Sequence, residues 1–133
     1  MIVIDSSAII AIFRQEDDAS RHAECIANDR DPMMSAASLV ETSIVLRALK
    51  KISSEKAERW LDEFIATAGI RIEPVTTTQA QIARAAHQRF GKGTGHGAAL
   101  NFGDCFAYAL AKEVGAPLLC KGQDFALTDI DIA

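Results

Sequence analysis

Short apolar runs alternate along the chain with longer segments of helical periodicity. The opening run Ile2-Val3-Ile4 is β-branched and has no polar position, which is typical of a central strand buried on both faces of a parallel sheet. Strands separated by helical segments predict an α/β protein with a parallel sheet. We expect strands at residues 2–4, 33–36, 70–75 and 117–120, and residues 130–132 are a candidate edge strand.

The helical segments are marked by apolar residues at spacings of three and four. Their starts carry side chains that cap helices: Ser6 or Ser7 for the first helix, Ser38 for the third and Asn101 for the last. Trp60 lies on the clearest apolar stripe and is expected in the core. We expect helices over residues 8–13, 19–27, 38–49, 53–68, 76–90 and 101–111.

Glu41 has two interpretations. The stretch Ser38-Leu39-Val40-Glu41 matches a capping box, in which Glu41 binds the backbone N–H of Ser38. Alternatively, Glu41 lies in the first turn of a helix that leaves a strand and points into the crevice where Asp5 emerges. The pattern of residues 38–41 alone leaves both interpretations open.

Residues 91–97 alternate glycine with other residues but match neither nucleotide-binding loop. The spacing is neither G-x-x-x-x-G-K-[ST] nor G-x-G-x-x-G, and no apolar strand leads into it. We interpret this stretch as a flexible connector that borders the site, with His96 solvated in it. His22, which lies on an apolar helical stripe, is expected to be packed rather than to bind a metal.

The chain has 133 residues, 49% hydrophobic and 24% charged, which fits one globular domain over residues 1–133. No apolar run is long enough to span a membrane, and we expect a cytoplasmic protein without a signal peptide. Its three cysteines, Cys25, Cys105 and Cys120, show no C-x-x-C spacing and are expected to be buried reduced thiols. The net charge of −4 weighs against nucleic-acid binding, apart from basic groups at residues 47–51 and 89–92.

Four acids occupy comparable places in this pattern. Asp5 and Asp124 follow apolar strands, while Glu41 and Asp104 fall in the first turns of helices. Carboxylates gathered at the carboxyl edge of a parallel sheet repel one another unless they are protonated or bridged by a hard cation. Mg²⁺, or Mn²⁺ in its place, prefers such oxygen ligands. The sequence therefore favours metal-assisted phosphoryl chemistry.

At these residues the chain resembles the PIN-domain family, and in particular the VapC-type ribonuclease toxins of bacterial toxin–antitoxin pairs. The resemblance covers the whole chain and is carried by three stretches in order. They are Ile-Val-Ile-Asp-Ser-Ser-Ala at residues 2–8, Leu-Asn-Phe-Gly-Asp-Cys-Phe-Ala-Tyr-Ala-Leu at residues 100–110, and Leu-Leu-Cys-Lys-Gly-Gln-Asp-Phe at residues 118–125.

The resemblance implies a three-layer α/β/α PIN-like fold with a short central parallel sheet, Mg²⁺-dependent cleavage of RNA, a homodimer and inhibition by a cognate antitoxin. It also implies the acidic quartet Asp5, Glu41, Asp104 and Asp124, with Asp5 and Asp104 as the most direct metal ligands. Ser7 would orient Asp5 or the attacking water. Family members often have threonine where this chain has Ser6, which keeps the hydroxyl.

Two other functional classes stay open from the sequence. A receiver-like phosphoacceptor domain also gathers acids at a sheet edge, but residues 33–36 lack the aspartate that its middle strand needs. A PIN-like binding module that has lost catalysis is the second class. Such modules usually lose an acid, whereas all four acids are present here.

Overall fold

Four short parallel strands form one sheet in the order β3-β2-β1-β4. The computed structural model describes residues 1–133. Strand β1 lies inside the sheet and pairs with β2 through Ile2 and Pro32 and with β4 through Val3 and Leu118. The predicted α/β fold with a short central parallel sheet is confirmed. The strands are β1 (Ile2–Ile4), β2 (Pro32–Ser35), β3 (Arg71–Glu73) and β4 (Leu118–Leu119).

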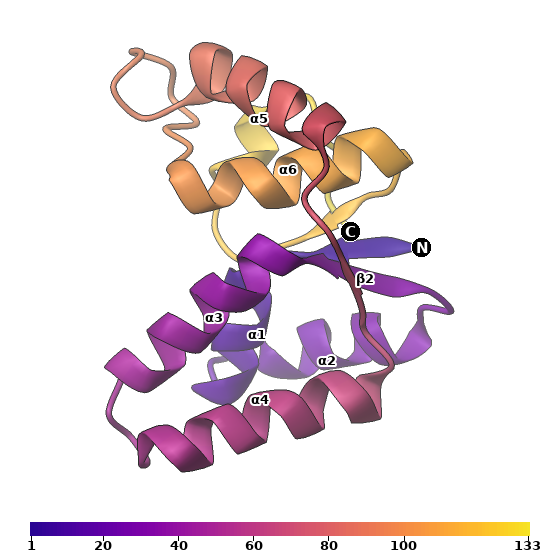
Figure 1. Cartoon of the computed structure of the whole chain (residues 1–133), viewed down its shortest axis with the longest axis vertical. Coiled ribbons are helices and arrows are strands. Elements are labelled where there is room, and N and C mark those ends of the chain that lie inside the picture. The colour runs from indigo at the N-terminus through magenta and orange to yellow at the C-terminus, as the bar shows by residue number, and fades with distance from the viewer.

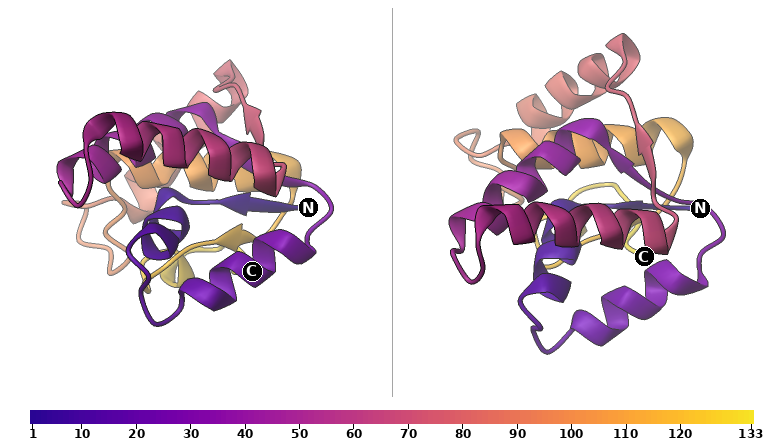
Figure 2. Two further views of the ribbon diagram at one scale, coloured as in Figure 1. Left: turned by 90° about the horizontal axis from the view of Figure 1, so that it is seen from below. Right: turned by 60° about the horizontal axis from the view of Figure 1, so that its bottom comes forward.

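Helices cover both faces of this sheet and give it three layers (Figures 1 and 2). The helices are α1 (Ser6–Phe13), α2 (Ala19–Asn28), α3 (Ala36–Ala48), α4 (Ser54–Ala68), α5 (Thr77–Phe90) and α6 (Phe102–Val114), followed by the short 3-10 helix η1 (Phe125–Leu127). Helices α5 and α6 lie on one side, and α1 to α4 lie on the other (Figure 1). None of them is both long and apolar enough to cross a bilayer.

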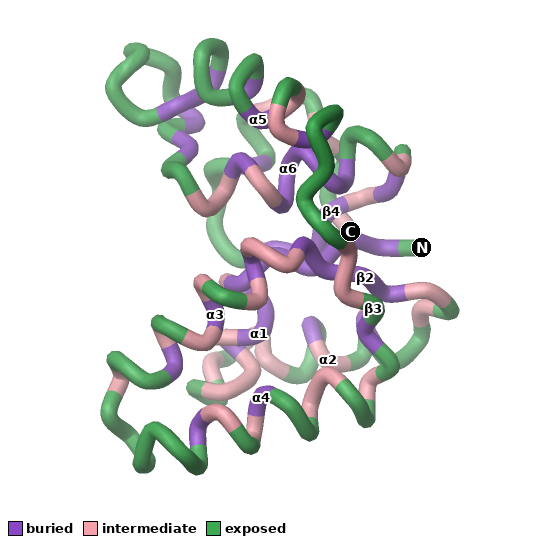
Figure 3. The backbone as a smooth tube through the Cα atoms, viewed as in Figure 1, coloured by how far each residue is buried: buried purple, intermediate pink, exposed green.

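Alternation along the strands divides the core between the two faces. Val3 and Met33 belong to the apolar cluster with α5 and α6, whereas Ile2, Ile4 and Met34 belong to the cluster with α1 to α4. This follows because successive side chains of a strand point to opposite faces. The buried parts of the tube in Figure 3 accordingly run through β1, β2 and β4 and the helix sides that face them, whereas the edge strand β3 is only partly buried.

Helix α1 begins earlier than its sequence pattern predicts. The predicted caps Ser6 and Ser7 are already helical, and Asp5 is the N-cap, with an extended backbone and a side chain that accepts a hydrogen bond from the Ser7 N–H. The helix starts here because β1 ends at Ile4 and leaves a carboxylate in the capping position. Asp5 therefore belongs to both the end of a strand and the start of a helix.

Helix α3 also begins earlier than predicted. Ser35, the last residue of β2, caps this helix, so the helix begins at Ala36 and Ser38 is already inside it. The Ser38 carbonyl accepts a hydrogen bond of 2.7 Å from the Thr42 hydroxyl, and the Ser38 hydroxyl is buried without a partner. The predicted capping box between Ser38 and Glu41 is therefore wrong. Glu41 lies in the second turn, where its carboxylate is not needed at the helix end.

The starts of α4, α5 and α6 agree with the sequence, whereas α6 continues to Val114, past its predicted end at residue 111. Ser53 caps α4, and Gly69 ends it in the left-handed conformation with φ of 66°. Thr76 caps α5, and Asn101 caps α6. At the outer edge of β4, residues 130–132 contribute only one parallel bridge, through Ile132, instead of a full strand.

The structure also tests the predicted packing of His22, Trp60 and the three cysteines. His22 is fully buried and hydrogen-bonded to the Asp18 carboxylate at 3.0 Å, which confirms a packed histidine. Trp60 is only half-buried and stacks against Phe64 with ring centroids 5.1 Å apart, at the margin of the core. All three cysteines are free thiols, and Cys105 and Cys120 are buried as expected, whereas Cys25 is only partly buried.

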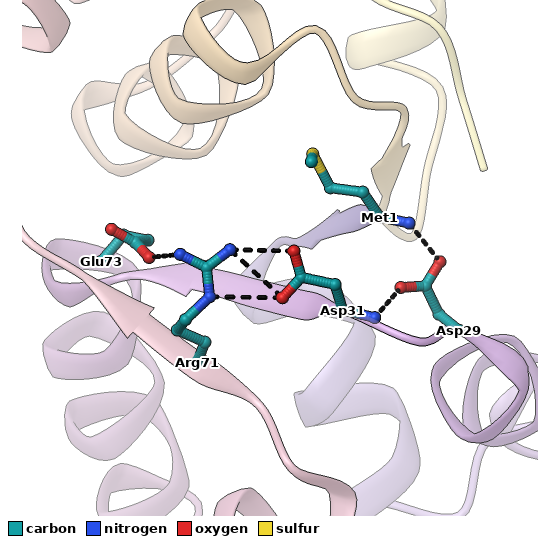
Figure 4. Close-up of polar contacts among 5 residues, drawn as sticks. All are labelled: Met1, Asp29, Asp31, Arg71 and Glu73. Atoms are coloured by element: carbon teal, nitrogen blue, oxygen red, sulfur yellow. Dashed lines mark hydrogen bonds and ion pairs between the residues drawn. The ribbon is translucent and has the colours of Figure 1, made fainter.

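Charged side chains link the amino ends of the strands, at the edge of the sheet opposite to Asp5 (Figure 4). The Arg71 guanidinium binds the Asp31 carboxylate at 2.9 Å and also the Glu73 carboxylate. The amino terminus of Met1 binds Asp29 at 3.0 Å. Arg71 and Asp31 are about half exposed, so this surface pair contributes at most about 1 kcal/mol.

Candidate active site

Asp5 is the buried centre of the carboxyl edge of the sheet. Its backbone N–H donates to the Leu119 carbonyl at 2.9 Å, which fixes the residue between β1 and β4. Only 2% of Asp5 is exposed. Its Oδ2 atom accepts two hydrogen bonds from Ser7, one from the backbone N–H at 3.0 Å and one from the hydroxyl at 2.6 Å. Its Oδ1 atom is buried and has no hydrogen-bond partner.

Ser7 is itself held in one orientation. Its hydroxyl donates to Asp5 and accepts a hydrogen bond of 2.9 Å from the backbone N–H of Lys121. The Lys121 side chain in turn pairs with Glu16 and Asp18. The loop after β4 is thereby joined to the start of α1, and the Ser7 hydroxyl hydrogen is directed at Asp5.

Glu41 reaches the same edge from α3. Its Oε1 atom accepts a hydrogen bond of 2.6 Å from the hydroxyl of Ser6, the residue next to Asp5. The Glu41 carboxylate also lies directly against Gly103, at the start of α6. Glu41 therefore joins the starts of α1 and α6, as in the interpretation that points it toward Asp5.

Asp104 closes the cluster from the first turn of α6. The Asn101 side chain accepts from the Asp104 N–H at 2.9 Å, and the Asp104 Oδ2 atom accepts from the Asn101 N–H at 3.0 Å. This reciprocal pair is a complete capping box. It commits one carboxylate oxygen of Asp104 to the helix end.

Negative charge on neighbouring acids raises the pKa of Asp5 and of Asp104. Burial raises the pKa of Asp5 to about 6, the hydrogen bonds from Ser7 oppose this rise, and the charges of Asp104 and Glu41 add to it. Burial also raises the pKa of Asp104, as do the charges of Glu41 and Asp124. The pKa of the neighbouring Cys120 thiol rises to about 12 through burial, with contributions from Asp5 and Asp104. This edge of the sheet is therefore a region of concentrated negative charge.

Asp124 lies at the rim of this cluster. It is exposed, precedes the 3-10 helix η1 and makes no side-chain capping hydrogen bond. Its charge acts on Asp104, while the groups that perturb Asp5 are Ser7, Asp104 and Glu41. The structure thus brings Asp5, Glu41 and Asp104 together and leaves Asp124 beside Asp104.

The donor set has the chemistry of a site for a hard cation. As the side chains stand, no three carboxylate, imidazole or thiol groups lie close enough to hold an ion together. The unpartnered Oδ1 atom of Asp5 is nevertheless a buried acceptor next to two further carboxylates, a position that costs free energy without a cation or a donor. Oxygen donors of this kind suit Mg²⁺ or Mn²⁺.

Sequence reasoning assigned no role in the site to Gly103 or to the backbone N–H of Lys121. Gly103 is the one glycine inside a helix of this chain, and glycine is unfavourable there by about 1 kcal/mol relative to alanine. That conflict with helix propensity was a signal for a close approach at Gly103. The backbone contact of Lys121 with Ser7 has no counterpart in the residue pattern.

Comparisons with known proteins show the family of the chain. The family model of the PIN domain matches residues 2–131. The chain is 48% identical over 132 residues to a protein named ribonuclease VapC28 of Mycobacterium tuberculosis, covering 99% of this chain and 97% of the relative.

Two solved structures share the fold. VapC20 of Mycobacterium tuberculosis, described as a toxin that cleaves the sarcin–ricin loop, has a TM-score of 0.78 at 18% identity, covering 100% of this chain and 98% of that chain. VapBC2 of Rickettsia felis, bound to a DNA fragment from its promoter, has a TM-score of 0.75 at 18% identity, covering 99% of this chain and 96% of that chain.

Proposed function

The chain belongs to the PIN-domain family and, within it, to the VapC ribonucleases, and we propose that it is the toxin of a toxin–antitoxin pair that hydrolyses RNA with Mg²⁺ or Mn²⁺. The whole chain acts as one PIN-like domain in this proposal. The observation that carries the metal dependence is the buried Asp5 carboxylate, whose Oδ1 atom has no partner and whose neighbours are also acids.

The four acids have different roles in the proposed reaction. Asp5 and Asp104 hold the ion directly, and Glu41 and Asp124 complete its surroundings or orient the attacking water. A bound divalent ion supplies a Lewis acid that lowers the pKa of water and offsets the charge developing on the phosphate. Ser7 occupies Oδ2 of Asp5 and thereby leaves Oδ1 for the cation. Asn101 holds Asp104 in a fixed orientation in the same way.

The net charge of −4 is compatible with an RNA substrate, because the charge is unevenly distributed along the chain. Residues 74–103 contain no Asp or Glu and carry Arg84, Arg89 and Lys92, so the rest of the chain is strongly acidic by comparison. This stretch includes α5 and leads directly into the start of α6, two residues before Asp104. We propose that it binds the phosphates of RNA that flank the scissile bond.

Two protein partners belong to the proposal. A cognate antitoxin is supported by structural neighbours that are toxin–antitoxin complexes, such as one from Klebsiella pneumoniae. A homodimer is supported by exposed apolar side chains at the start of α6 and on α3. Phe102 is 79% exposed, Val40 59% and Ile44 52%. Phe102 also borders an apolar groove of about 460 Å³ between α5 and α6.

The decisive experiment measures RNA cleavage by protein purified without antitoxin. We expect cleavage with Mg²⁺ or Mn²⁺ that stops with EDTA. Asp104→Asn should reduce the rate about 100-fold or more, because it removes a charge that acts in the transition state. The protein should stay folded, because the asparagine oxygen can still accept from the Asn101 N–H. Asp17→Asn is the matched control, since Asp17 is an exposed acid outside the cluster.

Two results would contradict the proposal. Cleavage that persists in EDTA would exclude the metal mechanism. A protein that binds RNA but never cleaves it, with either ion, would instead be the catalytically inactive PIN-like binding module. The receiver-like alternative does not fit, because the family is that of PIN domains and β2, Pro32–Ser35, contains no aspartate.

A further inference from the structure

Gly103 occupies a helical position where the backbone does not require glycine. It is the second residue of α6, between Phe102 and Asp104, and its φ lies outside the left-handed region. Alanine is favoured over glycine in a helix, so a glycine here loses stability that another residue would provide. The reason for glycine must therefore lie in what surrounds the residue.

The space of a side chain at Gly103 is filled by the Glu41 carboxylate. A Cβ atom at Gly103 would lie 2.6 Å from Glu41 Cδ and 2.9 Å from Glu41 Oε1, and it would be closer still to Oε2. Carbon atoms in contact are normally about 3.5 to 4.0 Å apart, so the two groups exclude each other. Glu41 therefore reaches its place only because residue 103 has no side chain.

Glu41 is the partner that would move if a methyl group were added. The clash involves the end of a long side chain, whereas Gly103 belongs to the backbone of a helix that is fixed by its capping box. Moving the carboxylate breaks its 2.6 Å hydrogen bond with Ser6 and removes it from the neighbourhood of Asp5 and Asp104. The three atoms nearest to the added methyl group all belong to Glu41, so the rest of the fold can stay in place.

We propose that Gly103 is a positioning residue, whose missing side chain admits the Glu41 carboxylate to the acidic cluster at the start of α6. Its effect on catalysis rests on the proposed ribonuclease function, whereas its contact with Glu41 does not. Gly103 acts through Glu41 alone, and replacing it should affect the protein as the loss of Glu41 does.

The experiment is a double-mutant cycle with wild type, Gly103→Ala, Glu41→Ala and the double variant. Gly103→Ala should lower kcat to the level of Glu41→Ala, about 100-fold below wild type, with little change in KM. In the Glu41→Ala background, the same change should have no further effect on kcat. Asp62→Ala is the control, because Asp62 is an exposed residue of α4, away from the acidic cluster and from residues 74–103.

Thermal unfolding in EDTA tests the contact independently of activity. Once Glu41 is alanine, Gly103→Ala should raise the melting temperature by about 3 °C, because only the helix preference of alanine remains. In the wild-type background this gain should be absent. A residue needed only for the helix would instead give the same shift in both backgrounds.

Three outcomes would overturn the proposal. These are cleavage by Gly103→Ala within twofold of wild type, a further loss of more than tenfold in the Glu41→Ala background, or equal melting shifts in both backgrounds. If Gly103→Ala does not fold, a folded double variant still identifies Glu41 as the cause, and an unfolded one refutes it. If wild type cleaves no RNA, the proposed function fails, while the melting cycle still tests the contact between Gly103 and Glu41.

Discussion

Replacing Asp5 by asparagine should stabilise the protein when no metal is bound. Asp5 is almost fully buried, and its pKa is raised from 3.8 to about 6 by burial first and then by the charges of Asp104 and Glu41. Asparagine has nearly the same shape and keeps an oxygen for the two hydrogen bonds from Ser7. Its neutral amide would occupy the place of the unpartnered Oδ1 atom.

The size and sign of this effect follow from the pKa. Each unit of pKa shift corresponds to 1.36 kcal/mol, so a rise from 3.8 to about 6 amounts to about 3 kcal/mol. Because the folded state binds the proton more tightly than the unfolded state, this stability is fully present below pH 4 and is lost as the pH rises through about 6. Asp5→Asn has no such charge to bury. Its advantage over wild type should therefore grow from near zero at pH 4 to about 3 kcal/mol at pH 8.

The assay is urea unfolding of wild type and Asp5→Asn in EDTA at several pH values between 4 and 8. An advantage of about 3 kcal/mol corresponds to a melting temperature roughly 10 °C higher for a domain of this size. Adding excess Mg²⁺ should stabilise wild type and leave the variant unchanged, since binding to the folded state alone shifts the equilibrium. A variant that is less stable than wild type in EDTA at pH 8 would refute the reasoning.

Three further predictions concern partners and stability. We expect an arginine of the cognate antitoxin to pair with Asp5 and Asp104. The double variant Asp5→Asn, Asp104→Asn should therefore bind the antitoxin at least tenfold more weakly in a calorimetric titration. An unchanged affinity would exclude that arrangement. Wild type should sediment as a dimer at micromolar concentration, and Phe102→Ser should shift the protein toward monomer. A monomeric wild type would exclude the proposed homodimer. Asp129→Ala should lower the free energy of unfolding by about 1 kcal/mol at pH 7, because the Tyr108 hydroxyl loses the carboxylate that accepts its 2.5 Å hydrogen bond. The Asp129 pKa is lowered by that bond, so urea unfolding near pH 3 should show a smaller difference, and a constant difference would contradict this role.

Local chemistry in the sequence was enough to predict the strands and most helix ends. The apolar run Ile2–Ile4 followed by Asp5 defines a buried strand and its polar end, and both occur in the structure. Asn101 and Asp104 lie three residues apart, the spacing of a reciprocal cap, and the structure contains the complete capping box. These features depend on neighbours within a few residues, which is why the sequence contains enough information to predict them.

The start of α3 was not predictable in the same way. Ser35 and Ser38 are both good N-caps, and the sequence between them contains two alanines that fit a helix or a loop. The choice depends on pairing between distant strands, because Ser35 is held in β2 opposite Glu73 and the helix begins as soon as that pairing ends. The capping-box interpretation of Glu41 was wrong for this reason, and the interpretation that points it toward Asp5 agrees with the structure.

The contact of Glu41 with Gly103 lies further beyond sequence reasoning, because it joins residues 62 positions apart. The acidic quartet is predicted by the places of the four acids in the sequence pattern and by the resemblance, and its members differ in the structure in a way that neither expresses. The charges of Asp104 and Glu41 raise the pKa of Asp5, whereas the charge of Asp124, at the rim, raises the pKa of Asp104. Asp124 follows β4 through a loop of exposed residues, and the sequence does not determine the course of that loop.

The adjacent hydroxyls of Ser6 and Ser7 explain how mutually repelling acids are held at one edge of the sheet. Ser7 donates to Asp5 and Ser6 donates to Glu41, each at 2.6 Å, so the first two residues of α1 orient carboxylates from two different elements. The Ser7 hydrogen bonds lower the pKa of Asp5, so its value of about 6 already includes them, and without them ionising the buried Asp5 would cost more than about 3 kcal/mol. Helix α1 therefore has to begin at Ser6. A start two residues later, as the apolar pattern alone suggests, would leave both hydroxyls in the loop and the two carboxylates without a common support.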